Sequence, residues 1–309
     1  MKHVKLFEAF STPKPLTEDQ KIWLDKCAKG GWSLNPSTGL IDVGYGFDCY
    51  QQDLTDFKGV RFGRAKGNFD CSFNQLTSLE GAPQTVGGYF YCDSNQLTSL
   101  VGAPKTVKGD FFCQYNQLTS LDGAPETVDG RFICDNNQLT SLVGAPQTVG
   151  GRFHCGDNQL TSLEGAPQSV GESFYCTDNQ LTSLNGAPQT VNRDFYCNYN
   201  QLTSLDGAPK TVNRDFYCNN NQLKSLDGAP KTVNGNFYCG SNPVSERTLE
   251  SIFKIMKKGK SYQQALLEFW PEMDNDDRTP MYKDHNSLTP DEIRKYQALG
   301  TVNRIKGYL

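Results

Sequence analysis

The sequence predicts a repeat solenoid, a rod made by stacking short copies of one structural unit. Nine of the 11 cysteines recur at an unbroken interval of 21 residues, from Cys71 to Cys239. Eight complete copies of one pattern run from Asn74 to Ser241 without insertion or deletion, as stacking on a fixed pitch requires. Each copy carries about seven small apolar side chains, too few to fold alone, so stacking must join them into one continuous core.

One copy, residues 95–115, shows how the unit is built. It reads N-Q-L-T-S-L-V-G-A-P-K-T-V-K-G-D-F-F-C-Q-Y. Phe111 and Cys113 are two residues apart, which places both on the same face of a short strand. The two leucines three apart, Leu97 and Leu100, indicate an arc that turns the chain back, and Gly-Ala-Pro punctuates it. We expect the asparagine that opens each copy to form a ladder that satisfies backbone groups at this bend.

The repeat cysteines follow the same spacing and are expected to be buried as small hydrophobic residues. In-register parallel neighbours would hold their Cβ atoms near about 4.8 Å, longer than the roughly 3.5–4.5 Å of a disulfide. No C-x-x-C pair is present, so a metal site would need ligands from several copies. Disulfides or a metal remain the weaker alternatives. Many free thiols predict a reducing compartment, and hence a cytoplasmic protein.

Written from the strand, the pattern x-F-x-C-x-x-N-x-L-x-x-L resembles a leucine-rich repeat with Phe and Cys at two leucine positions. The closing L-T-S-L-x-G-A-P is similar to the short repeat of secreted effector proteins from enteric bacteria. The resemblance covers residues 44–243 and implies a leucine-rich-repeat-like curved rod with a parallel β-sheet on its concave face. Nine or ten strands at about 4.8 Å each would span roughly 45 Å. The 21-residue length and one extra residue between Val and Phe depart from the family pattern.

Both ends of the repeat region carry segments suited to cover a terminal apolar layer. Thr17 and Gln20 form a capping-box pattern, and a predicted helix, strand, turn and strand make residues 17–43 a small α/β cap after a tail at 1–16. Helical spacing predicts helices that begin after Ser245, over 261–270 and after Thr289, so residues 244–309 form a helical cap.

Composition excludes several functions. The net charge is −4, which argues against a nucleic-acid groove. No apolar stretch approaches the roughly 18 residues of a membrane span, and the first ten residues do not resemble a signal peptide. Only three histidines exist, and a catalytic dyad would have to use His154, whose strand neighbours should point the other way. We therefore expect no enzyme activity, no cofactor and no metal.

What varies among copies indicates a binding surface. The residues that flank the inward Phe must point outward, and those that follow it form an aromatic stripe that is continuous in its C-terminal half. One interpretation is cross-strand stacking, and the other is a recognition surface for a protein partner of unknown identity; the two are compatible. The neighbouring positions change from Arg131 and Arg152 to Asp194 and Asp215, which adds a polarity to the surface. The candidate binding residues are Tyr89, Tyr91, Phe112, Arg131, Ile133, Arg152, His154, Tyr175, Tyr196, Tyr217 and Tyr238.

The first ten residues, M-K-H-V-K-L-F-E-A-F, support a second hypothesis. They resemble short N-terminal tags on proteins of large tailed bacteriophages, and Leu6-Phe7-Glu8 is similar to a prohead-protease site. This resemblance implies a phage-encoded protein in the host cytoplasm or the virion. A structural or head-associated phage component, which includes self-association, is therefore the alternative to a protein-binding solenoid.

Overall fold

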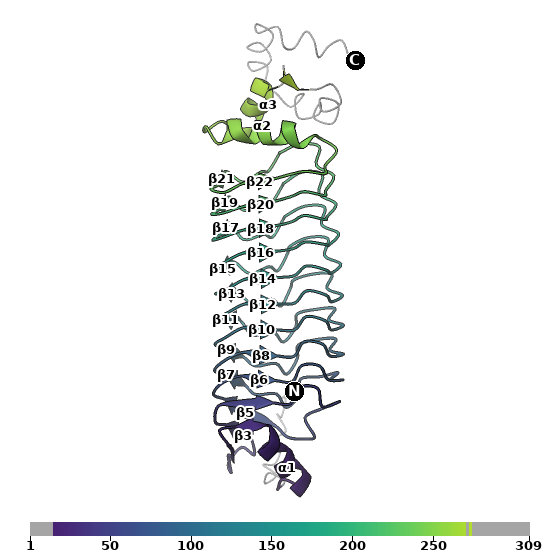
Figure 1. Ribbon diagram of the computed structural model, residues 1–309, viewed down its shortest axis with the longest axis vertical. Coiled ribbons are helices and arrows are strands. Elements are labelled where there is room, and N and C mark those ends of the chain that lie inside the picture. Colours follow the sequence, from purple (N-terminus) through teal and green to yellow (C-terminus); the bar gives the residue numbers. More distant parts are fainter. Residues whose placement is uncertain (1–14, 270–271, 274–309) are drawn as a thin grey trace, which may run out of the picture.

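The computed structural model describes residues 15–269 and 272–273, which form a straight stack of turns in the view of Figure 1. The first turns come from α1 (Glu18–Cys27), β1 (Ala28–Lys29), β2 (Trp32–Leu34), β3 (Ile41–Val43), β4 (Gly46–Asp48) and β5 (Phe62–Ala65). Each later turn supplies one strand that begins with the inward Phe. These strands are β6 (Phe69–Asp70), β8 (Phe90–Tyr91), β10 (Phe111–Phe112), β12 (Phe132–Ile133), β14 (Phe153–His154), β16 (Phe174–Tyr175), β18 (Phe195–Tyr196), β20 (Phe216–Tyr217) and β22 (Phe237–Tyr238).

A second short strand precedes the Phe strand in most turns, and the sequence pattern does not predict it. These strands are β7 (Thr85–Val86), β9 (Thr106–Val107), β11 (Thr127–Val128), β13 (Thr148–Val149), β15 (Ser169–Val170), β17 (Thr190–Val191), β19 (Thr211–Val212) and β21 (Thr232–Val233). The extra residue between Val and Phe lies in the corner that joins the two strands. Each turn is therefore built on two sheet faces.

The strands of successive turns pair in register. The Phe strands and β4 form one 11-stranded sheet that is parallel except where β1 joins β4. Strands β7, β9, β11, β13 and β15 form an 8-stranded sheet together with β2, β3 and β5, and β17, β19 and β21 form a separate 3-stranded sheet. The predicted fold class, a leucine-rich-repeat-like solenoid with a parallel sheet, is confirmed. Among the described residues, no helix has the length and apolar character needed to span a bilayer.

The core is a set of side-chain columns that run along the rod. The inward phenylalanines from Phe47 to Phe237 stack on one another with ring centroids 5.2–5.8 Å apart. The leucines, valines and cysteines of each turn are buried around them. Every core layer repeats the one below it. Each copy therefore buries its apolar side chains against those of its two neighbours.

The asparagine ladder satisfies the backbone as predicted. Asn95 Oδ1 accepts a hydrogen bond from the N–H of Leu76 in the previous turn at 2.9 Å. Its Nδ2 donates to the carbonyls of Cys71, Cys92 and Asp93 at 3.0–3.2 Å. The same set recurs from Asn116 to Asn221. These asparagines are therefore bound to the turn itself.

All 11 cysteines are free and buried, and for the repeat cysteines the burial confirms what their spacing predicts. From Cys49 to Cys197, each thiol donates to a carbonyl of the next turn with Sγ–O distances of 3.0–3.4 Å. Burial raises the pKa of Cys71 and of the other thiols in this column well above the ordinary range. They stay protonated near neutral pH, which makes them poor nucleophiles and poor metal ligands.

Helices lie at both ends of the stack. The capping box at α1 is present, because Gln20 N donates to Thr17 Oγ1 while Thr17 N donates to Gln20 Oε1. Trp23 of this helix packs edge-on against Phe47, with ring centroids 5.1 Å apart.

At the other end, α2 (Glu246–Met256) lies across the last turn and α3 (Tyr262–Phe269) follows it (Figure 1). Ser245 is the N-cap residue of α2, as predicted, and Phe253 of this helix stacks on Phe237 with centroids 4.2 Å apart. The helix expected after Thr289 and the N-terminal decapeptide lie outside the described residues.

Candidate protein-binding face

The predicted binding residues occupy two adjacent columns on the outer face of the 11-stranded sheet. The aromatic column contains the residues that follow the inward Phe, and in-register pairing places each directly above the last. Its members are Tyr91, Phe112, Ile133, His154, Tyr175, Tyr196, Tyr217 and Tyr238. The flanking column contains the residues that precede the inward Phe. Its members are Asn68, Tyr89, Asp110, Arg131, Arg152, Ser173, Asp194, Asp215 and Asn236.

The rings of the aromatic column stack face to face. From Tyr175 to Tyr238 the centroids are 4.4–4.6 Å apart and the planes differ by 6–14°. Tyr91 and Phe112 form a second stack, 4.8 Å apart, and Ile133 separates the two. Within a stack each ring face is covered by the next ring. The column therefore offers ring edges and hydroxyl groups to a partner, while a free ring face exists only where a stack ends.

The tyrosine hydroxyls are held as hydrogen-bonding groups. Tyr217 donates to Asp215 Oδ2 at 3.2 Å, and Asn236 Nδ2 donates to the hydroxyl of Tyr238 at 3.2 Å. Burial raises the pKa of Tyr217 above its ordinary value, and the negative charge of the nearby Asp215 raises it further. The hydroxyl of Tyr217 stays protonated near neutral pH.

His154 starts the longer stack, 3.8 Å from Tyr175. Burial, with smaller contributions from the positive charges of Arg152 and Arg131, lowers the pKa of His154 to about 4. The imidazole is therefore neutral near pH 7 and packs as an aromatic ring.

Replacing His154 with tyrosine should remove a loss of stability on acidification. The unfolded chain takes up a proton near pH 6.5 and the folded chain only near pH 4, so the unfolded state binds more protons between these values. Stability then falls as the pH falls, by up to about 3 kcal/mol. Urea unfolding at several pH values should show a gap between the two proteins that widens toward pH 4. Asp93, whose pKa burial raises to about 6, acts in the opposite direction but is present in both proteins. Parallel pH profiles would contradict the prediction.

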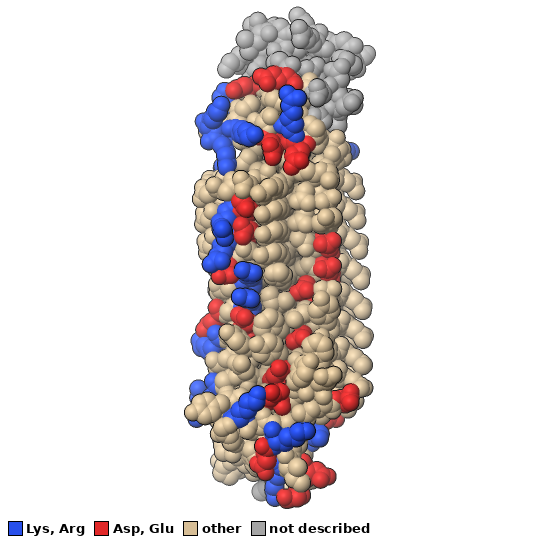
Figure 2. Space-filling model, viewed as in Figure 1, with Lys and Arg blue, Asp and Glu red and all other residues tan. Residues whose placement is uncertain are grey.

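The flanking column combines ion pairs with backbone contacts. Arg152 Nε lies 3.2 Å from Glu172 Oε2, and Arg131 Nε lies 4.0 Å from Asp110 Oδ2. In Figure 2 an uncharged strip runs along the rod between a mixed line of basic and acidic side chains and a line of acidic ones.

The aspartates of the flanking column also have a structural role that the sequence does not reveal. Asp194 Oδ1 accepts from Asp215 N at 3.1 Å, and Asp215 Oδ1 accepts from Asn236 N at 2.7 Å. Each carboxylate thus satisfies the backbone of the next turn. The change from arginine to aspartate along this column therefore does not by itself indicate partner recognition.

Two pockets lie at the ends of the aromatic column, and the sequence pattern predicts neither of them. The first, of about 360 Å³, is lined by Lys29, Tyr45, Gly46, Phe47, Asp48, Gly67, Asn68, Asp70 and Tyr91. The second, of about 290 Å³, is lined by Gly235, Asn236, Phe237, Tyr238, Glu250, Phe253, Lys254 and Lys257. The sequence carries one sign of the first pocket. Asp48 and Asp70 occupy the position of the aromatic column in the two turns before Tyr91. In the part of the chain that the structure describes, no group of three or more His, Cys, Asp or Glu side chains could hold a metal ion.

Comparisons with known proteins add a distant structural likeness. No protein-family model matches this chain, and the search of curated proteins found no match. Among solved structures, YopM from Yersinia enterocolitica WA-314 is similar with a TM-score of 0.36 and 18% identity. The likeness covers 59% of this chain and 49% of YopM, so it spans about half of that protein. The description of this chain as a leucine-rich-repeat-like solenoid therefore stands on its own repeat, its in-register parallel sheets and its asparagine ladder.

Proposed function

We propose that this protein is a non-enzymatic scaffold that binds another protein through the aromatic column and the flanking column. The observation that carries the proposal is the stack from His154 to Tyr238, which fixes the edges of five rings along one face. Tyrosine edges and hydroxyls provide apolar contact and hydrogen bonds together, and tyrosine and arginine are enriched in protein interfaces.

The order of this face favours binding. The rings are held by their neighbours and by the sheet, and from Tyr91 to Tyr217 the side chains are half-buried. Association normally costs about 0.5–1.5 kcal/mol for each side chain that must be immobilised. These side chains are already immobilised in the free protein, so binding loses less side-chain entropy and each contact contributes more to the affinity. Tyr89, which is 42% exposed, extends the surface beside Tyr91.

Support for a non-catalytic role comes from the groups that would otherwise act. The thiols of the cysteine column are buried and protonated, and His154 is stacked and neutral. Nucleophilic catalysis needs a nucleophile and a base within hydrogen-bond reach of each other. Thiols of the cysteine column donate hydrogen bonds to backbone carbonyls, and Cys27 Sγ accepts one from Gln52 Nε2. The thiol of Cys134 donates to the backbone carbonyl of His154, and among the described residues no thiol hydrogen bond involves the imidazole of His154.

The test replaces Tyr175, Tyr196 and Tyr217 with threonine, which also favours strands. A displayed library of random peptides, selected against the immobilised wild-type protein, supplies the probe. We expect the selected peptides to bind the triple variant at least tenfold more weakly. Lost stacking should lower the free energy of unfolding by on the order of 1–3 kcal/mol in total, which leaves the fold intact.

The matched control changes three exposed side chains on another edge of the same turns. Thr182, Thr203 and Lys224 are each replaced with serine, and the peptides should bind this control with wild-type affinity. If the peptides bind the tyrosine variant normally while only its melting temperature falls, the tyrosines form a structural ladder and the binding proposal is wrong.

A further inference from the structure

The N-terminal end of the aromatic column leaves one aromatic ring half covered. Phe112 covers one face of Tyr91, with centroids 4.8 Å apart and planes within 2°. On the other side, in-register pairing places Asp70 beneath Tyr91 and Asp48 beneath Asp70. A carboxylate thus stands where the next ring would be. The second face of Tyr91 borders the pocket of about 360 Å³ described above.

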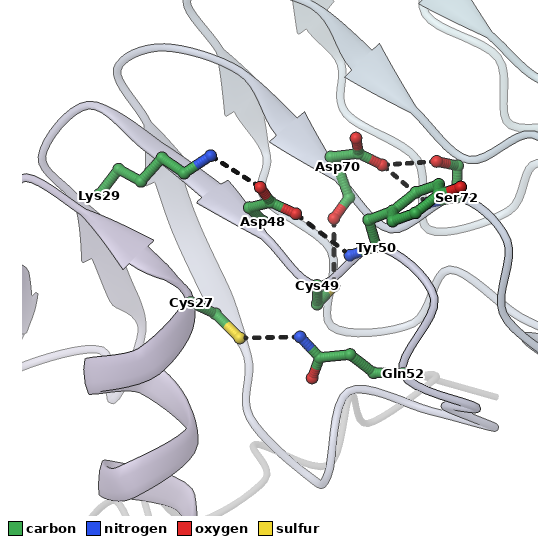
Figure 3. Close-up of polar contacts among 8 residues, drawn as sticks. All are labelled: Cys27, Lys29, Asp48, Cys49, Tyr50, Gln52, Asp70 and Ser72. Carbon is green, nitrogen blue, oxygen red and sulfur yellow. Dashed lines mark hydrogen bonds and ion pairs between the residues drawn. The ribbon is translucent and has the colours of Figure 1, made fainter.

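The carboxylates of this pocket differ in how far they are satisfied (Figure 3). Asp48 Oδ2 accepts from Lys29 Nζ at 2.7 Å. Asp70 Oδ1 accepts from the backbone N and the hydroxyl of Ser72, at 3.0 and 2.6 Å. Within the described residues Asp70 Oδ2 accepts no hydrogen bond. The pocket therefore keeps an anionic acceptor free beside an aromatic face.

The charge of the lining selects the ligand. Lys29 contributes one positive charge against the two negative charges of Asp48 and Asp70, so the pocket is anionic. Tyr45 adds a second aromatic side chain, 75% exposed, at the same pocket. A cation gains from an aromatic face and from carboxylates together. The pocket at the other end of the column has two lysines against one glutamate and is therefore cationic.

We infer that the N-terminal pocket binds the guanidinium of an arginine side chain from the partner protein, stacked on Tyr91 and hydrogen-bonded to Asp70. A guanidinium is planar and carries five N–H donors, so it can lie against a ring while its edge reaches a carboxylate. An ammonium group would give up the stacking contact. This inference rests on the proposed function and names the chemistry of one anchor of the partner.

The test uses small molecules on the full-length protein. Nα-acetyl-L-arginine amide carries the guanidinium, and Nα-acetyl-L-citrulline amide has nearly the same shape without the charge. We expect the arginine compound to bind at least tenfold more tightly in ligand-observed NMR titrations. Its affinity should fall as salt is added, because the pocket is open to solvent. Equal binding of the two compounds would overturn the inference.

Three single variants locate the binding. Asp70→Asn keeps an acceptor for Ser72 but removes the charge, and Tyr91→Leu removes the ring; each should weaken arginine-amide binding at least fivefold. Tyr199→Leu removes an exposed tyrosine that belongs to neither column and should leave the affinity unchanged. Equal losses in all three variants would assign the binding elsewhere. Circular dichroism checks that each variant folds.

One further variant separates an external partner from the chain's own basic N-terminus. Lys2 and Lys5 are replaced with glutamine in the full-length protein. Unchanged affinity for the arginine compound supports an external partner, whereas a severalfold increase would show that the N-terminal segment occupies the pocket. The titration uses only Tyr91 from the aromatic column. A failure here therefore leaves the peptide test of the tyrosine triple variant standing, and the reverse also holds.

Discussion

Replacing Asn158 with alanine is expected to lower the free energy of unfolding by about 3–5 kcal/mol, because several buried backbone groups lose their partner at once. Asn158 Oδ1 accepts from Leu139 N at 2.9 Å. Its Nδ2 donates to the carbonyls of Cys134, Cys155 and Gly156 at 2.9–3.3 Å. Alanine leaves the N–H of Leu139 without this acceptor in a site that excludes water. Urea unfolding followed by circular dichroism measures the loss.

The neighbouring exposed residue provides the control. Gln159→Ala removes a side-chain amide from the surface of the same bend and should change stability by less than about 0.5 kcal/mol. Asn158→Asp keeps an acceptor for Leu139 but points a carboxylate at three carbonyls, so it should destabilise at least as much as alanine. Hydrogen exchange should show the loss concentrated in the turns of Leu139 and Asn158. A cost of Asn158→Ala no larger than that of Gln159→Ala would show that the ladder is not structural.

The parts of the fold that could be predicted are those that depend on the period alone. A fixed 21-residue interval places identical residues above one another, so one copy fixes the position of Phe, Cys and Asn in all copies. The Thr-Val strand could not be predicted, because two residues are too few to show alternation. That strand exists through pairing with the turns above and below it, as between Thr127 and Thr148.

The candidate site was predictable in position but not in geometry. The alternation around Phe174 and Cys176 places Tyr175 on the outer face, and the structure places it there. Cross-strand stacking is one of the two interpretations that the sequence allows, and the structure shows that the rings stack with nearly parallel planes. That arrangement follows from the roughly 4.8 Å spacing of paired strands, which is close to a stacking distance, and it hides the ring faces from a partner.

The N-terminal pocket could not be derived from the repeat, because all of its lining residues except Tyr91 precede the first complete copy at Asn74. Lys29 lies in β1 and Tyr45 lies in the link between β3 and β4. Their positions depend on how the first turns fold against the stack, and no periodicity encodes that. In the same way, the hydrogen bonds of Asp194 and Asp215 to the next turn depend on a corner whose shape the sequence pattern does not specify.

Replacing Phe253 with aspartate is expected to detach α2 from the last turn and to make the protein self-associate. Phe253 is 4% exposed and stacks on Phe237 at 4.2 Å, so a carboxylate there would be buried against an apolar layer. The lost contact should cost about 3–5 kcal/mol at this end of the rod. Detachment also exposes β22, an edge strand with unpaired backbone groups, and such edges template pairing with other chains. Light scattering over a range of protein concentrations measures the association.

The control for this variant adds the same charge to the same helix at a solvent-facing position. Ser251→Asp should leave the protein monomeric, since Ser251 is partly exposed and its hydroxyl donates to the backbone carbonyl of Arg247 in its own helix. Deleting residues 244–309 should reproduce the Phe253→Asp result with a larger effect, because it removes the cover of Phe237 completely. A truncated protein that stays monomeric with an unchanged melting temperature would show that the helices form a separate module. The last solenoid turn would then be stable without a cap, which a stack of mutually dependent repeats does not allow.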